Sequence, residues 1–155
     1  MARFILASDY DMQIKQEIIR LLTDQDFYQS AKLVRAEQTA IRQIRNRIGK
    51  RYDCDLIFAP ILPPVVGDPE GVQLDTRDQW IVTITIDIAL YHLCSQTGMK
   101  DIPEHRANRY QDAIDWLKDT GNGSSLAELP ALVDGNGDEY SGVIINSRPQ
   151  EDHRW

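Results

Sequence analysis

Hydrophobic residues recur at helical intervals along most of the chain. The first such pattern opens at Ser8 or Asp9, either of which can cap free backbone N–H groups, and it continues through Ile14, Ile18, Leu21 and Leu22 to about Thr23. A second, longer pattern starts near Phe27 and places apolar residues at steps of three, four or seven, at Val34, Ile41, Ile44, Ile48 and Tyr52. The spacing predicts two helices, each with one buried face.

The stretch from Trp80 to Ile88 fits two kinds of element. Apolar and polar residues alternate there, as they do in a half-buried strand. However, the apolar run continues without a helix breaker to Gly98, which is too long for an average strand. Four of its residues also share a helical face, namely Ile81, Ile84, Ile88 and Tyr91. We therefore predict a buried helix from Trp80 to Ser95.

A fourth helix is expected to begin at Pro103, because proline suits the first helical turn and Glu104 then lies favourably in the helix dipole. Gly121 and Gly123 are expected to end it. Its apolar stripe consists of Ala107, Tyr110, Ala113 or Ile114, and Leu117. The third and fourth helices would form a hairpin, and we predict that its seam contains Ile84, Ile88, Tyr91, Tyr110, Ile114 and Leu117.

Two segments break the helical pattern. Prolines and glycines between Asp53 and Asp75 rule out a continuous helix and predict an extended, turn-rich loop, whose apolar residues should pack on something. Beyond residue 126 the chain is rich in glycine and polar residues and cannot build a core alone. The predicted fold is an all-α bundle of about four helices over residues 1–126, with a long Pro-rich loop at 53–75 and an extended tail at 127–155.

The distribution of charge singles out the second helix. The 155-residue chain carries 24 acidic and 17 basic residues, a net charge of −7, which argues against a general nucleic-acid coat. Yet residues 31–52 contain seven basic residues and one acid, which gives 7 − 1 = +6. The candidate interface residues in this stretch are Arg35, Arg42, Arg45, Arg47, Lys50 and Arg51. They form either a solvated face, partly paired with acids of neighbouring helices, or a surface that meets another subunit or lines a channel for DNA.

Candidate sites for chemistry do not have the spacing that their chemistry needs. Residues 134–138 resemble the start of a calcium loop, but Glu139 and Ile145 occupy positions that require glycine and glutamate, so a turn is the better interpretation. Possible zinc ligands lack the paired spacing of structural sites; they are Cys54, Cys94, His92 and His105. No nucleophile elbow or phosphate-binding loop is present in its required context. We predict no metal, no cofactor and no enzymatic activity.

The sequence also bears on the cellular compartment. The apolar run at the N-terminus is too short for a signal peptide, and no stretch reaches the roughly 18 apolar residues of a membrane span. The two cysteines are 40 positions apart, which gives no support for a disulfide framework. The protein is expected to be made and kept in a cytoplasm, with reduced thiols and without a membrane partner.

Three blocks of sequence resemble a known family. They are Arg47-Ile48-Gly49-Lys50-Arg51-Tyr52-Asp53, Asp87-Ile88-Ala89-Leu90-Tyr91-His92-Leu93 and Arg109-Tyr110-Gln111-Asp112-Ala113-Ile114-Asp115-Trp116-Leu117. In their order and separation they are similar to a Mu-like prophage family, long catalogued as a domain of unknown function and regarded as head-to-tail connector proteins. The resemblance spans roughly Ala7 to Leu126.

The resemblance implies a structural role in the virion, with the protein in the cytoplasm of a bacterial host during assembly. Such a protein would assemble as a homo-oligomeric ring beneath the portal, with portal and tail-completion proteins as partners and with DNA passing through the ring lumen. Ring subunits need two different complementary patches. The main alternative is a small host-encoded helical module that binds protein or nucleic acid, and an enzyme with an unrecognised site is a third.

Overall fold

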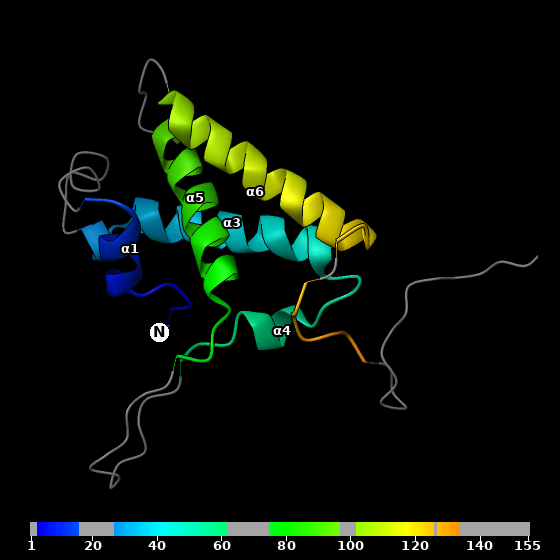
Figure 1. Cartoon of the computed structure of the whole chain (residues 1–155). Coiled ribbons are helices and arrows are strands. Elements are labelled where there is room, and N and C mark those ends of the chain that lie inside the picture. Colours follow the sequence, from blue (N-terminus) through cyan, green and yellow to red (C-terminus); the bar gives the residue numbers. More distant parts are fainter. Residues whose placement is uncertain (1–2, 16–26, 62–74, 97–101, 126, 134–155) are drawn as a thin grey trace, which may run out of the picture.

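The computed structural model describes residues 3–15, 27–61, 75–96, 102–125 and 127–133. In chain order these contain α1 (Ala7–Gln13), the 3-10 turn η1 (Phe27–Gln29), α3 (Ala31–Ile48), α4 (Cys54–Ile57), α5 (Gln79–Gln96) and α6 (Glu104–Asn122). The predicted all-α bundle is confirmed (Figure 1). The calcium-like stretch at 134–138, the Pro-rich residues 62–74 and most of the predicted tail lie outside the described ranges.

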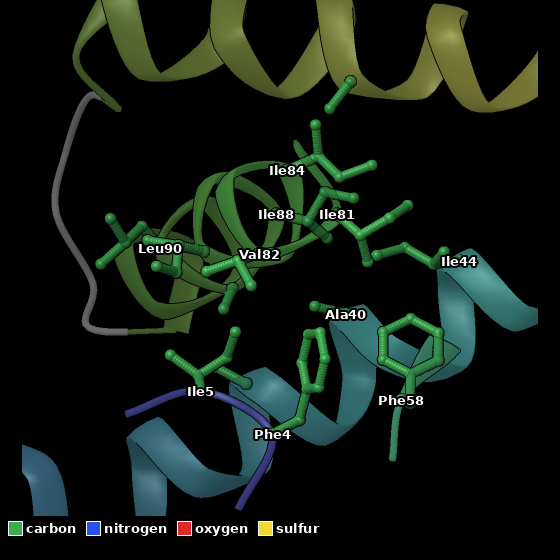
Figure 2. Close-up of a cluster of buried hydrophobic side chains, with 14 of the residues drawn as sticks. Phe4, Ile5, Ala40, Ile44, Phe58, Ile81, Val82, Ile84, Ile88 and Leu90 are labelled. Atoms are coloured by element: carbon green, nitrogen blue, oxygen red, sulfur yellow. The ribbon is translucent and has the colours of Figure 1, made fainter. Parts of the chain in front are cut away.

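Helix α5 is the centre of the bundle and packs against α1, α3 and α6. Figure 2 looks along α5, with α6 on one side and α3 on the other. Its side chains are buried nearly all round, from Ile81 to Leu93. Asp78 caps the helix by accepting a hydrogen bond of 2.8 Å from the Ile81 N–H. The prediction of a helix from Trp80 to Ser95 is therefore confirmed, and the alternative of a strand is wrong.

Helix α3 begins and ends inside the predicted range, after the 3-10 turn at Phe27 and before Gly49. Its buried face differs in part from the predicted stripe. Ile44 and Ile48 are fully buried, but Val34 and Ile41 are only half-buried. The buried positions nearer the start of the helix are Leu33, Ala36, Glu37 and Ala40. One of these, Ala40, faces α5 in Figure 2, where α3 and α5 pack together.

Helix α1 is shorter than predicted. It begins at Ala7, and Asp9 caps it from within the first turn by accepting a hydrogen bond of 2.7 Å from the Leu6 N–H. The helix ends at Gln13, because Ile14 has extended backbone angles (φ −147°, ψ 143°) and turns its side chain into the core. The prediction of one continuous helix from Ser8 to Thr23 is thus wrong at Ile14, and residues 16–23 lie outside the described ranges.

The start of the predicted Pro-rich loop folds as one helical turn. Asp53 caps α4 by accepting hydrogen bonds from the N–H groups of Asp55 (2.9 Å) and Leu56 (3.1 Å). Beyond α4, Phe58 is buried and its ring meets that of Phe4 edge-on at 5.0 Å. The expectation that this apolar segment packs on something is met for its first residues.

The segment 127–133 returns to the end of α3. Tyr52 and Ala131 form an antiparallel bridge, with hydrogen bonds from Asp53 N–H to the Pro130 carbonyl and from Leu132 N–H to the Arg51 carbonyl, each of 2.8 Å. The first residues beyond α6 therefore pack against the helical bundle.

Candidate functional site: the basic face of α3 and the helix junctions

The outward surface of α3 is hollowed and basic. The hollow has a volume of about 930 Å³ and opens widely to solvent. Its described lining comes from one side of α3 and consists of Arg35, Gln38, Thr39, Ile41, Arg42, Arg45 and Asn46. We call these residues the basic face. They lie opposite the side of α3 that packs on α5, because the two sets differ by about half a turn in a helix of 3.6 residues per turn.

The arginines of the basic face differ in their partners. Arg35 and Arg42 are exposed and form no ion pair with any described residue. Arg45 is ion-paired with Asp55 at 2.7 Å and lies over the Phe58 ring, 5.4 Å from its centroid. Asp55 is 89% exposed, so this pair contributes little stability, but it does link α4 to α3. Within the described ranges, Arg35 and Arg42 are therefore exposed charges without a counter-ion.

The other three predicted interface residues lie outside the hollow, and two of them are near the end of α6. The Arg47 side chain donates a hydrogen bond of 3.1 Å to the Gln43 carbonyl. The backbone carbonyl of Arg47 lies close to Gly121. The Arg51 guanidinium lies beside Gly123, whose left-handed backbone (φ 79°) ends α6. Lys50 is exposed. The six residues thus form no single surface: three line the hollow, two lie at the α3–α6 junction and Lys50 follows the end of α3.

The predicted hairpin seam residues come from α5 and α6. Ile84, Ile88 and Leu117 are buried, with at most 1% exposure. Tyr91 and Tyr110 stack with ring centroids 4.0 Å apart and planes 12° from parallel. Ile114 is half-buried and packs on the same core.

A polar network joins α3 to this seam through Gln43, which sequence reasoning did not identify. The Gln43 side-chain amide donates to the Tyr110 hydroxyl, and its Oε1 lies 2.9 Å from His92 Nε2. Because an amide oxygen can only accept, His92 must donate from Nε2. Burial lowers the pKa of His92 below its usual value. A single glutamine in a helix leaves no sequence signal that could have shown this role.

Asp87 forms the second link of the hairpin. It is buried on α5 and accepts a hydrogen bond of 2.9 Å from Arg109 Nε, with Arg106 at 3.5 Å. Arg106 is itself mostly buried, and this burial lowers the pKa of its guanidinium. Asp87 and Arg109 each belong to a block that carried the family resemblance, but their pairing could not be read from the sequence.

Two further buried networks hold the N-terminal segment. Glu37 on α3 accepts hydrogen bonds from Arg3 and from the Tyr10 hydroxyl, and burial raises its pKa. Arg77, just before α5, pairs with both Asp9 (2.7 Å) and Asp75 (2.6 Å). The hydrogen bond from Arg77 lowers the pKa of Asp75 to about 2. The sequence analysis did not identify these ion pairs, because most of the paired residues are far apart in the sequence and come together only in the folded chain.

The candidate zinc ligands are not brought together. Cys54 and Cys94 are buried thiols whose pKa values are raised by burial. His92 contacts Gln43 instead, and His105 is exposed. Among the described residues, no group of three or more His, Cys, Asp or Glu side chains could hold a metal ion.

The second and third blocks that carried the resemblance meet in the α5–α6 hairpin, and the first block lies against the end of α6. A family model for Bacteriophage Mu, Gp36 matches residues 7–135. The chain belongs to this phage family. No curated protein and no solved structure matches it.

Membership of the Gp36 family confirms the Mu-like phage resemblance, and the matched residues include every described helix. In the described part of the chain, no helix is long and apolar enough to cross a membrane.

Proposed function

We propose that this member of the Gp36 family is a head-to-tail connector, a structural protein that assembles beneath the portal of the phage particle and joins the filled head to the tail. The proposal includes a ring of identical subunits, portal and tail-completion proteins as neighbours, and no bond chemistry. The match to the Gp36 family over residues 7–135 is the observation that carries it.

The placement of the family-like blocks supports this role. Their polar residues hold helices together: Asp87 binds Arg109, Tyr91 stacks on Tyr110, and Arg51 lies against Gly123. These residues serve as scaffold, and the outward faces of α3 and α6 are left to meet other molecules. Charged outer faces suit an adaptor between two larger assemblies, because complementary charge steers docking and fixes its register.

Particles made without the protein test the proposal. Inactivating its gene in the phage should yield DNA-filled heads and free tails that remain separate in electron micrographs. Adding the purified full-length protein to such an extract should restore tailed, infectious particles. The protein should also be present in purified virions. Normal tailed particles in its absence would contradict the connector role.

A further inference from the structure

Helix α6 has an acidic outer face. Asp112, Asp115 and Asp119 are exposed, and helical spacing of three and four residues places them on one side of α6. We call these three residues the acidic face. They point away from Ala113, Leu117 and Thr120, which are buried against the rest of the bundle. The acidic face of α6 and the basic face of α3 are therefore both outward surfaces of the same subunit.

The two faces do not neutralise each other within the subunit. Among the residues that the structure describes, no ion pair joins a carboxylate of the acidic face to an arginine of α3. Asp115 accepts a side-chain hydrogen bond of 3.0 Å from Gln111. Arg35 and Arg42 form no ion pair with a described residue either. Both faces are therefore charged and exposed, and a second molecule can pair with them.

The charges of the two faces share a spacing. Arg35 and Arg42 are seven residues apart on α3, and Asp112 and Asp119 are seven residues apart on α6. Seven residues correspond to about two turns and a rise of about 10.5 Å in an α-helix. Two such helices lying side by side can bring each arginine to one aspartate in a single register.

We propose that the basic face of α3 in one copy docks on the acidic face of α6 in the next copy. Because the two faces differ, the contact is heterologous and repeats from subunit to subunit, as the closure of a ring requires. This inference rests on the proposed connector role and adds the surfaces that join the ring. A second copy is favoured over DNA as the occupant, because the same chain supplies the complementary charge.

Paired charge reversals in the full-length protein test the docking. The variant Arg35→Glu/Arg42→Glu and the variant Asp112→Arg/Asp119→Arg should each lower the yield of tailed, infectious particles on the order of tenfold or more in complementation of the gene-deficient phage. Combining all four substitutions in one chain reverses both partners of the contact. The combined variant should recover a yield within about threefold of the parent, because opposite charges again face each other.

The matched control reverses two exposed charges that lie outside both faces. Lys15→Glu/Lys50→Glu, at exposed positions outside α3 and α6, changes the same number of charges and should leave the yield unchanged. Thermal melting of each purified variant shows whether the fold is retained. If a reversed variant melts below the parent, the neutral pair at the same positions replaces it, either Arg35→Gln/Arg42→Gln or Asp112→Asn/Asp119→Asn, and should still lower the yield.

Three results would overturn the docking of α3 on α6. Unchanged yields for both reversals would show that neither face matters. A loss on reversing the α3 charges alone would show that the basic face meets DNA or the portal instead. A loss at both faces without recovery in the combined variant would show that each face meets a different molecule. The connector role is judged separately: variants that leave filled heads without tails uphold it, whatever the fate of the α3–α6 contact.

Discussion

Gly121 on α6 lies against the backbone carbonyl of Arg47 on α3, so closely that a Cβ at this position would overlap the carbonyl oxygen. The sequence predicted that Gly121 helps to end the fourth helix, but α6 continues to Asn122, and Gly123 is the residue that ends it. The role of Gly121 is to let two helices approach at their C-terminal ends.

Replacing Gly121 by alanine should therefore destabilise the protein. Alanine favours a helix over glycine by about 1 kcal/mol. The overlap is with backbone, which no side-chain rotation can relieve, and overpacking of this kind costs about 1–3 kcal/mol. We expect a net loss in the free energy of unfolding, measured by denaturant titration. Asn108→Ala, at an exposed position of the same helix, should be neutral or slightly stabilising. A Gly121→Ala variant as stable as the parent would show that the helices can separate at no cost.

Truncating the hairpin seam should cost far more than truncating a surface leucine. Ile88 and Leu117 are fully buried, so replacing either by alanine should lower the free energy of unfolding by about 2–5 kcal/mol. Leu56 is 62% exposed and provides the control, since Leu56→Ala should change stability by about half a kcal/mol at most. Equal, small effects at all three positions would mean that Ile88 and Leu117 do not form the packed seam between α5 and α6.

The apolar pattern was enough to locate the helices but not always to say which face is buried. Helix α5 has no single apolar stripe because it is covered on all sides, which is why its sequence also fitted a strand. The length of the uninterrupted apolar run correctly favoured a helix over a strand. Propensity could not show the break at Ile14, because nothing in the local sequence forbids a longer helix there.

The candidate site was less predictable, because it depends on distant pairs. Seven basic residues in one stretch correctly drew attention to α3, but the sequence could not show that Arg45 binds Asp55 while Arg47 and Arg51 lie at the α6 end. A test that reverses Arg42, Arg45 and Arg47 together would thus disturb the α4 contact and the helix junction along with the basic face. Arg35 and Arg42 are the cleaner choice.

Removing the Asp87 side chain should destabilise the protein more than removing that of Arg109, the nearer of its two arginine partners. Removing the carboxylate in Asp87→Ala leaves the mostly buried Arg106 without its counter-charge, and breaking a buried pair in this way costs about 3–5 kcal/mol. Arg109 is 47% exposed and can be solvated, so Arg109→Ala should cost about 1 kcal/mol or less. Denaturant melts of the two variants give the comparison. A larger loss for Arg109→Ala would place the important charge outside the buried cluster.

His92 should make the fold sensitive to mild acid. Burial lowers its pKa in the folded state below the value near 6.5 of the unfolded chain, so the unfolded state binds more protons as the pH falls through this range. Stability associated with His92 is therefore complete above about pH 6.5 and decreases below it, down to the folded-state pKa. Between about pH 7.5 and about pH 5.5, the free energy of unfolding should fall less in His92→Gln than in the parent. His105→Gln, at an exposed position of α6, should keep the parental pH dependence. If His92→Gln also keeps the parental pH dependence, the fold does not disfavour protonation of His92. The hydrogen bond to Gln43 would then stabilise the charged imidazole as well as the neutral one.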